Sequence, residues 1–234
     1  MSLFQPVNLV CPKCEAPVIM MAVGSVNADR RPDLRDDILA DRFQDIECDA
    51  CQEKFRLQPQ FNYLDVRRGQ WIAAMQADRM RDHLQVEDEA DLLFSESYGA
   101  KAPDAAQQVG KDLKMRVTFG WPAVREKLLI REHDLDDVVI EMIKLHILRS
   151  VPSVPLAEGI ELRFVEVDKD NDAYVFCWLE TASEEVIEDL RVPTELYEAI
   201  LANPSPWDAI RTRLENGAFV DMQKLYMGEG RQSE

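Results

Sequence analysis

The chain has 234 residues, 46% of them hydrophobic, and a formal net charge of −17 at pH 7. These values indicate a soluble globular protein with one large domain or two small ones, and the acidity counts against a protein that wraps DNA. The opening residues lack the pattern of a signal peptide, and the apolar run over residues 16–23 is too short to span a bilayer. We therefore expect a cytoplasmic protein with no membrane segment.

The negative charge is concentrated in the second part of the chain. Residues 1–83 contain 11 basic and 13 acidic side chains, whereas the remaining residues contain 16 basic and 31 acidic ones. The first part is therefore nearly neutral, and the strong acidity belongs to the rest.

Short strands with one helix between them are predicted for the first part of the chain. Alternating apolar residues and turn formers indicate the strands, and apolar residues at a spacing of three and four indicate the helix. The predicted elements are a strand over 17–28 with a turn at Gly24–Ser25, a helix over 33–43, a strand over 53–64 interrupted at Pro59, and a strand over 71–75.

Residues 84–110 are acidic and rich in small side chains, so we predict a link there, with a helix over its first half. Residues 111–234 are expected to form an α+β domain whose pattern changes from helical spacing to strict alternation and back. Its predicted elements are a strand over 113–119, helices over 121–133 and 135–150 with Asp134 as the cap of the second, a three-strand antiparallel meander over 160–192, two further helices up to Gly217, and a disordered tail from Gly228.

Four of the five cysteines lie in two C-x-x-C pairs, Cys11 with Cys14 and Cys48 with Cys51, separated by 33 residues. Two thiolates on each of two tight turns can converge on one metal ion as a tetrahedron, which leaves no position for water or substrate. We therefore predict a structural zinc site on a ribbon-like sheet. Iron is the other metal that four thiolates suit.

A dithiol redox motif is the main rival interpretation of either pair. Such a motif needs a strand that leads into a helix N-terminus, and the β-rich flanks and Pro17 do not supply one.

The two pairs, the CPKC form of the first, the stretch FRLQPQFNYLD and the distal stretch FGWPAVREKLLIREHDLDDVVIEMIKL together resemble the bacterial CpXC-domain proteins. The resemblance implies that Cys11, Cys14, Cys48 and Cys51 bind the metal, and it implies no activity. Glu15 and Gln52 depart from the common ribbon pattern, because glycine often follows the second cysteine. A different turn geometry is therefore expected at the two C-x-x-C turns, Cys11–Cys14 and Cys48–Cys51, which we call the knuckles.

Other residues that could carry chemistry have simpler explanations. The three histidines, His83, His133 and His146, lie in no catalytic motif, so we expect surface or packing roles. The run Asp168-Asp170-Asp172 resembles the start of a calcium loop but lacks its glycine and terminal glutamate, so a hairpin turn is favoured. Cys177 has no basic neighbour in the sequence and is expected to be a buried apolar residue. No catalytic residue is predicted.

Two small groups of arginines, Arg30-Arg31-Arg35 and Arg67-Arg68 followed by Trp71, could contact single-stranded nucleic acid. Aspartates are interleaved with the first group and cancel most of its field.

These observations lead to an α+β protein with three parts: a zinc-ribbon-like antiparallel β domain with a helical insertion over 1–83, the acidic link over 84–110, and an α+β domain over 111–234. The leading hypothesis is a non-enzymatic protein-interaction module in which structural zinc holds a small sheet and the acidic domain faces a basic or mixed protein partner. One alternative is nucleic-acid binding by the ribbon. The other is an enzyme with a site between the domains, around Trp121, Asp136, Asp137 or Trp178.

Overall fold

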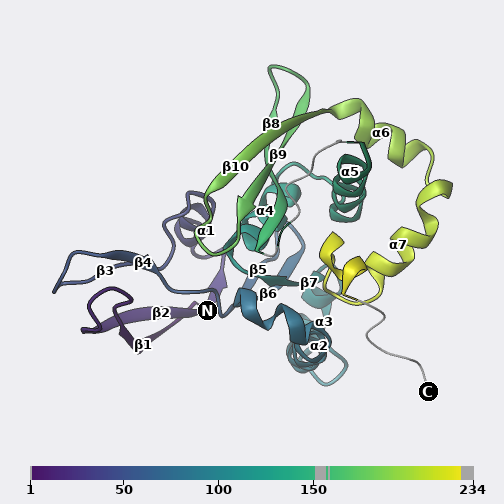
Figure 1. The fold of residues 1–234 in the computed structure, drawn as a ribbon. Helices are drawn as coiled ribbons and strands as arrows, with labels where there is room; N and C mark the ends of the chain where they lie inside the picture. The colour runs from purple at the N-terminus through teal and green to yellow at the C-terminus, as the bar shows by residue number, and fades with distance from the viewer. Residues whose placement is uncertain (1, 151–156, 158, 228–234) are drawn as a thin grey trace. The chain divides into compact units, whose positions relative to one another are not determined.

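The structure, a computed structural model, describes residues 2–150, 157 and 159–227. By contacts, the chain divides into two compact units, one of residues 1–80 and 90–121 and the other of residues 81–89 and 122–234. Seven α-helices and three sheets lie in the described part, so the predicted α+β class is confirmed (Figure 1).

The first unit is built on a five-stranded mixed sheet with the order β1-β2-β5-β6-β7. Its strands are β1 (Leu3–Val10), β2 (Pro17–Asn27), β5 (Phe61–Asp65), β6 (Gln70–Met75) and β7 (Lys114–Phe119). Neighbours are antiparallel at β1–β2 and β5–β6 but parallel at β2–β5 and β6–β7. The sheet is thus antiparallel only in part, and the strand predicted over 113–119 belongs to it.

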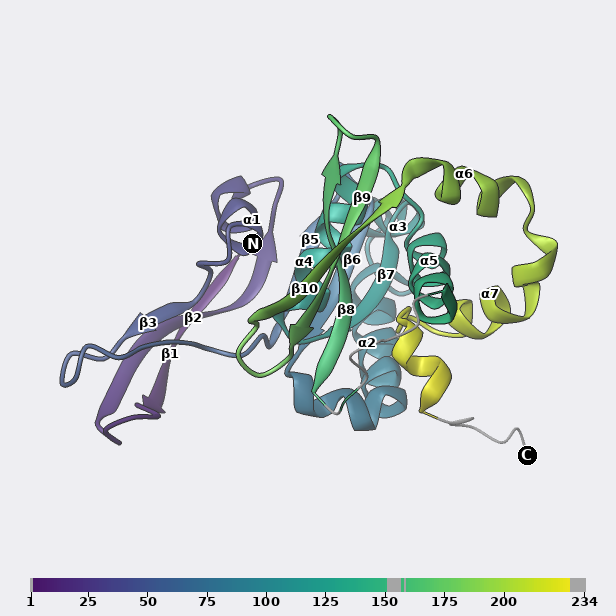
Figure 2. The same cartoon turned by 45° about the horizontal axis from the view of Figure 1, so that its top comes forward.

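The strands β1 and β2 extend beyond the rest of the sheet as a two-stranded ribbon. A second hairpin, formed by β3 (Asp45–Glu47) and β4 (Lys54–Arg56), runs alongside this ribbon in both views (Figures 1 and 2). The turn predicted at Gly24–Ser25 is absent, because β2 continues through both residues. The sequence misled because a glycine and a serine inside a strand look like a turn when the pairing partner is unknown.

Both faces of the central strands carry packed side chains. On one face, Phe43, Phe61 and Trp121 form an aromatic cluster with ring centroids 5.6–5.7 Å apart, and α1 (Pro32–Leu39) buries Leu34 and Ile38. On the other face, Trp71 of β6 meets Phe94 of α2 (His83–Tyr98) edge to face. The range predicted as an acidic link therefore has the helix expected in its first half, α2, and a second helix that was not expected, α3 (Asp104–Lys111).

The second unit contains the predicted antiparallel meander, in the order β10-β9-β8. Its central strand β9 is buried over all but its last residue because sheet neighbours flank it on both sides and helices pack over it. The remaining elements are β8 (Ile160–Asp168), β9 (Ala173–Glu180), β10 (Val186–Pro193), α4 (Trp121–Glu132), α5 (Asp137–Ser150), α6 (Thr194–Ala202), α7 (Asp208–Glu215), and the 3-10 helices η1 (Ala77–Asp82), η2 (Ser205–Trp207) and η3 (Met222–Tyr226).

The cap of α5 differs from the expectation. Asp136, and not Asp134, accepts a hydrogen bond from the backbone N–H of Val138 at 2.8 Å, and Asp134 itself has a left-handed backbone with φ of 53°. Several aspartates stand at this helix start, and only the backbone path decides which one reaches the free N–H groups. The tail from Gly228, predicted to be disordered, lies outside the described residues. No helix of the described part is long and apolar enough to cross a membrane.

Candidate metal centre

The four paired cysteines lie at the ends of the two hairpins. Cys11 and Cys14 lie between β1 and β2, and Cys48 and Cys51 lie between β3 and β4. Each hairpin therefore delivers two thiols from one tight turn, which is the arrangement that the spacing predicts.

The two turns have the same backbone hydrogen bonds. In the first, the N–H of Glu15 donates to Cys11 O at 3.0 Å, and the N–H of Cys11 donates to Ala16 O at 2.9 Å. In the second, the N–H of Gln52 donates to Cys48 O at 2.8 Å, and the N–H of Cys48 donates to Glu53 O at 2.9 Å. Both knuckles are thus fixed by their own backbone before any side chain contributes.

Glu15 and Gln52 adopt the left-handed conformation, with φ of 59° and 60°. This is the conformation for which glycine is favoured, because a Cβ there crowds the following carbonyl at a cost of about 1–2 kcal/mol. The expected difference in turn geometry is therefore wrong: the glycine-type turn is present in both knuckles, with a larger residue in the strained position.

The four sulfur atoms are close enough to share one metal ion. All lie within 4.8 Å of one another, with 3.6 Å between the Sγ atoms of Cys11 and Cys51 and 3.7 Å between those of Cys14 and Cys48. Four thiolates at about 2.3 Å from a central metal would be separated by about 3.8 Å, so the spacing fits a tetrahedral site. Cys11 and Cys48 are buried, whereas Cys14 is exposed.

The surroundings favour a thiolate at one of the cysteines. Burial opposes it, but hydrogen bonds from the backbone amides of Cys14 and Lys13 lower the pKa of Cys11 to about 7. At Cys51 the backbone amide of Glu53 acts in the same direction, yet burial and the neighbouring thiols raise the pKa to about 12. The cluster therefore gives up a first proton readily, and a bound metal cation would have to displace the others. An ion pair of 2.7 Å between Lys13 and Glu53 ties the two knuckles together.

The fold and the cysteine cluster define an α+β protein with a ribbon-like centre of four cysteines that can bind a metal ion in a structural role. The chain belongs to the CpXC family: the family described as CpXC protein matches residues 9–144. This range covers both knuckles and ends within α5. Comparison with curated proteins and with solved structures finds no significant match.

A second cluster of ligand-type side chains lies in the second unit. Glu126 of α4, Glu141 of α5 and Asp221 before η3 have carboxylate oxygens within 4.8 Å of one another, and all three side chains are buried. The ammonium of Lys144 lies 2.6 Å from Glu126 and 3.0 Å from Glu141, and the guanidinium of Arg163 lies 2.9 Å from Glu126 and 2.6 Å from Asp221. The side-chain cations of Lys144 and Arg163 already neutralise these carboxylates, so this cluster is an ion-pair network and not a metal site.

The network is larger than this trio. Lys127 pairs with Asp137 and Glu141 at 3.3 Å, and Arg163 also pairs with Glu161. Arg163 has its pKa raised well above its usual value: burial opposes this, but the nearby carboxylates outweigh it. At Glu126, burial is likewise outweighed by Lys144 and Arg163, which lower the pKa of the carboxyl, whereas at Glu161 burial prevails and raises it. Of these residues the sequence pointed only to Asp137. The available signal for the others was a charged pair, Glu141 and Lys144, inside the otherwise apolar run from Val138 to Leu145 of α5.

The histidines stay apart from both clusters. His83 is buried beside the ring of Phe219, with 5.5 Å between centroids, His133 is half-buried, and His146 is exposed near Ser150. Among the described residues no histidine belongs to either cluster, and the contact of 3.3 Å between His146 and Ser150 lies at the exposed end of α5.

The remaining candidates have structural contacts. Asp168 accepts hydrogen bonds from the backbone and side chain of Asn171, which lower its pKa and close the β8–β9 turn. Cys177 is buried in β9, and burial raises the pKa of its thiol. Trp121 donates its indole N–H to Leu57 O at 3.0 Å within the first unit, and Trp178 is buried in the core of the second.

The arginines of the first unit are largely paired with aspartates. Arg31 pairs with Asp33 at 2.5 Å, and Arg67 pairs with Asp29 at 3.4 Å. Arg35 and Arg68 both face Asp65, and Arg35 is itself buried. These contacts reduce the charge that the two arginine groups could offer to phosphates.

Proposed function

We propose that this protein is a non-enzymatic protein-interaction module in which a structural zinc ion, bound by Cys11, Cys14, Cys48 and Cys51, holds a ribbon that contacts a protein partner. A zinc ion is favoured because four cysteine thiols at tetrahedral spacing are a usual structural zinc set, with iron as the other metal that such a set accepts. The reducing cytoplasm is the compartment that suits free thiols.

One observation carries the proposal: an exposed apolar face on the β1–β2 ribbon. In the cross-strand pairs Pro6–Met21, Asn8–Ile19 and Val10–Pro17 both residues are exposed, and these pairs alternate with the half-buried pairs Val7–Met20 and Leu9–Val18. Val10, Ile19 and Met21 are 63%, 72% and 55% exposed. A contiguous apolar patch of this kind marks an interaction surface in a soluble protein.

The apolar ribbon face, defined as Phe4, Pro6, Val10, Ile19 and Met21, adjoins the cysteine knuckle because Val10 directly precedes Cys11. β1 is also an edge strand of its sheet, so its outer backbone groups can pair with an incoming strand. Fixing the ribbon with a metal would lower the entropy lost when a partner binds it. The paired arginines described above favour a protein partner over nucleic acid.

Affinity capture from a bacterial lysate followed by mass spectrometry tests this function. The wild-type chain is compared with Ile19→Asp/Met21→Asp, which changes the apolar ribbon face, and with Leu92→Asp, a matched change of an exposed leucine on α2 that is 62% exposed. A captured protein should be lost with the ribbon variant and kept with Leu92→Asp. Metal content and thermal stability should be unchanged in both variants.

The proposal is wrong if both variants capture the same proteins as the wild type. Retention of RNA or DNA by the wild-type chain, with an affinity that falls steeply as salt rises, would instead support nucleic-acid binding.

A further inference from the structure

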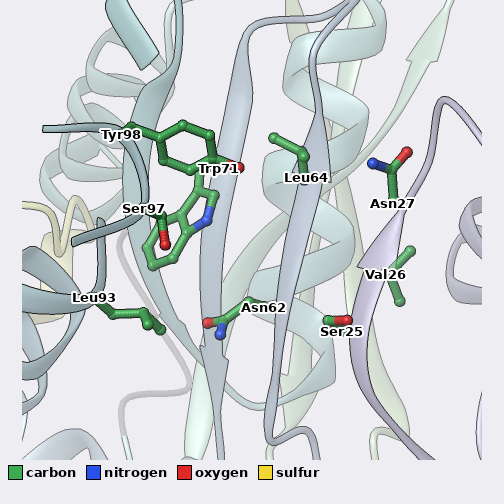
Figure 3. A pocket seen from close by; sticks show the side chains of 9 residues that line it. All are labelled: Ser25, Val26, Asn27, Asn62, Leu64, Trp71, Leu93, Ser97 and Tyr98. Atoms are coloured by element: carbon green, nitrogen blue, oxygen red, sulfur yellow. The ribbon is translucent and has the colours of Figure 1, made fainter. Parts of the chain in front are cut away.

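A cavity of about 190 Å³ lies in the first unit between α2 and the strands β2, β5 and β6. Asn62 and Leu64 of β5 and Asn27 of β2 form one side, and Trp71 of β6 forms the other together with Ser97 and Tyr98 of α2 (Figure 3). The cavity is smaller than the roughly 300 Å³ at which drug-sized ligands bind, so it suits a ligand of about one ring.

Four polar groups at this cavity lack a hydrogen-bond partner among the described residues. They are the side-chain amide of Asn62, the indole N–H of Trp71, and the hydroxyls of Ser97 and Tyr98. In Figure 3 the indole nitrogen of Trp71 and the amide of Asn62 both point into the space between them. Trp71 as a whole is only 4% exposed, and its indole N–H has no partner among the described residues, whereas that of Trp121 has one.

The lining contains no charged side chain. A phosphate, carboxylate or ammonium bound here would lose hydration without gaining a counter-charge, so a charged ligand is disfavoured. Hydroxyl and carboxamide groups both donate and accept hydrogen bonds, and the indole N–H only donates. A matching ligand therefore offers several groups that can do both, and it also has an apolar face for Leu64 and the aromatic rings.

We propose that this cavity binds a neutral sugar ring, whose hydroxyls would bond to Asn62, Trp71 and Ser97 while its C–H face lies against Leu64. The same ring chemistry can come from a free monosaccharide or from the ribose of a nucleoside. This site is separate from the apolar ribbon face and does not depend on the protein-interaction function.

The test uses the indole N–H signals of the full-length protein in a ¹H–¹⁵N spectrum, with the Trp71 signal assigned from Trp71→Phe. D-glucose, D-galactose, D-ribose, uridine and glucose 6-phosphate are titrated separately. At least one neutral sugar should shift the Trp71 signal saturably, with a dissociation constant on the order of 1 mM, while the Trp121 signal stays in place. Glucose 6-phosphate should bind more weakly than glucose.

Two variants test the assigned contacts. Asn62→Ala and Ser97→Ala should each weaken sugar binding by about tenfold, the loss expected for one hydrogen bond. Asn8→Ala, a matched change on the exposed part of β1, should have no effect. The backbone spectrum of each variant shows whether the sheet is retained.

Three results would overturn the proposal. They are the absence of a saturable Trp71 shift with every neutral sugar, an unchanged affinity in both Asn62→Ala and Ser97→Ala, and tighter binding of glucose 6-phosphate than of glucose. Binding of uridine without binding of ribose would assign the cavity to the base and would also reject the sugar.

Discussion

Lys144 and Glu126 form an ion pair of 2.6 Å although neither side chain is exposed to solvent. Removing two charges from water is costly, and the cost is offset only when every remaining lone pair and proton has a partner. Here Glu126 also accepts the backbone N–H of Phe164 at 2.7 Å and the guanidinium of Arg163. The pair therefore joins α4, α5 and β8 through groups that cannot turn to solvent.

Loss of the lysine should strongly destabilise the second unit. In Lys144→Met the carboxylates of Glu126 and Glu141 stay buried while the cation that lies nearest to both is lost. We expect a loss of about 3–5 kcal/mol, the usual cost of breaking a buried pair by removing one partner. Urea unfolding, followed through the exchange of β9 amide hydrogens, measures it.

A matched control and a double variant sharpen this prediction. Lys169→Met removes an exposed lysine from the β8–β9 turn and should change stability by less than about 0.5 kcal/mol. Lys144→Met/Glu126→Gln should lose less than the two single losses added together, because the two groups interact directly. Equal stabilities of Lys144→Met and Lys169→Met would show that the pair contributes nothing.

Asp221 should make the second unit sensitive to acid. Burial alone would raise the pKa of the Asp221 carboxyl, but the charges of Arg163 and Lys144 outweigh burial and lower this pKa from 3.8 to about 2. A carboxyl whose pKa is lower in the folded state than in the unfolded state stabilises the fold at pH values above its unfolded-state pKa. This stability is lost as the pH falls from about 4 to about 2. The contribution is about 2 kcal/mol. Unfolding midpoints in urea across this range measure it.

The variant Asp221→Asn isolates this group. An asparagine oxygen can still accept the hydrogen bond that Asp221 takes from the backbone N–H of Gln223 at 2.9 Å, so the start of η3 is kept. The variant should be less stable at pH 7 and should lose less stability between pH 4 and pH 2 than the wild type. Asp170→Asn, on the exposed turn after β8, should keep the wild-type pH dependence. The same pH dependence in Asp221→Asn and the wild type would reject the assignment.

Local patterns predicted much of this fold because local rules govern those parts. The meander over 160–192 shows strict alternation, and α5 begins at a cluster of aspartates, so both could be found within a window of ten to fifteen residues. The two knuckles were also predictable, since the ligand type and the two-residue spacing define the turn.

Long-range pairing and buried charge could not be predicted in the same way. Glu161 and Arg163 lie in an alternating strand and look like its solvent face, yet both are buried. Their environment depends on Asp221 and Glu126, which are far away in the sequence. The parallel pairing of β6 with β7 is equally invisible locally, because no turn joins the two strands.

The four-cysteine cluster should hold about one equivalent of zinc or iron. Structural metal sites contribute on the order of 10 kcal/mol, so Cys48→Ser should unfold the ribbon and leave the antiparallel meander folded. Elemental analysis of protein purified without added metal measures the first point, and hydrogen exchange over β2 and β9 measures the second. Cys177→Ala, which changes a buried cysteine outside the cluster, should keep the metal. Less than about half an equivalent in intact wild-type protein would contradict the site.

Glycine at the strained knuckle positions should stabilise the ribbon. Glu15 and Gln52 have left-handed backbones that cost about 1–2 kcal/mol in a residue with a Cβ. Glycine removes this strain but adds freedom to the unfolded chain, which returns about 0.4–1 kcal/mol. We therefore expect Gln52→Gly to raise the free energy of unfolding of the first unit by about 0.5–1 kcal/mol, with a slower loss of metal to a chelator.

Asp49→Gly is the matched control, because Asp49 lies in the same knuckle without a positive φ and glycine there gains no relief of strain. It should lower stability, since only the unfolded state benefits. If Gln52→Gly and Asp49→Gly destabilise the ribbon equally, the left-handed turn is not under strain.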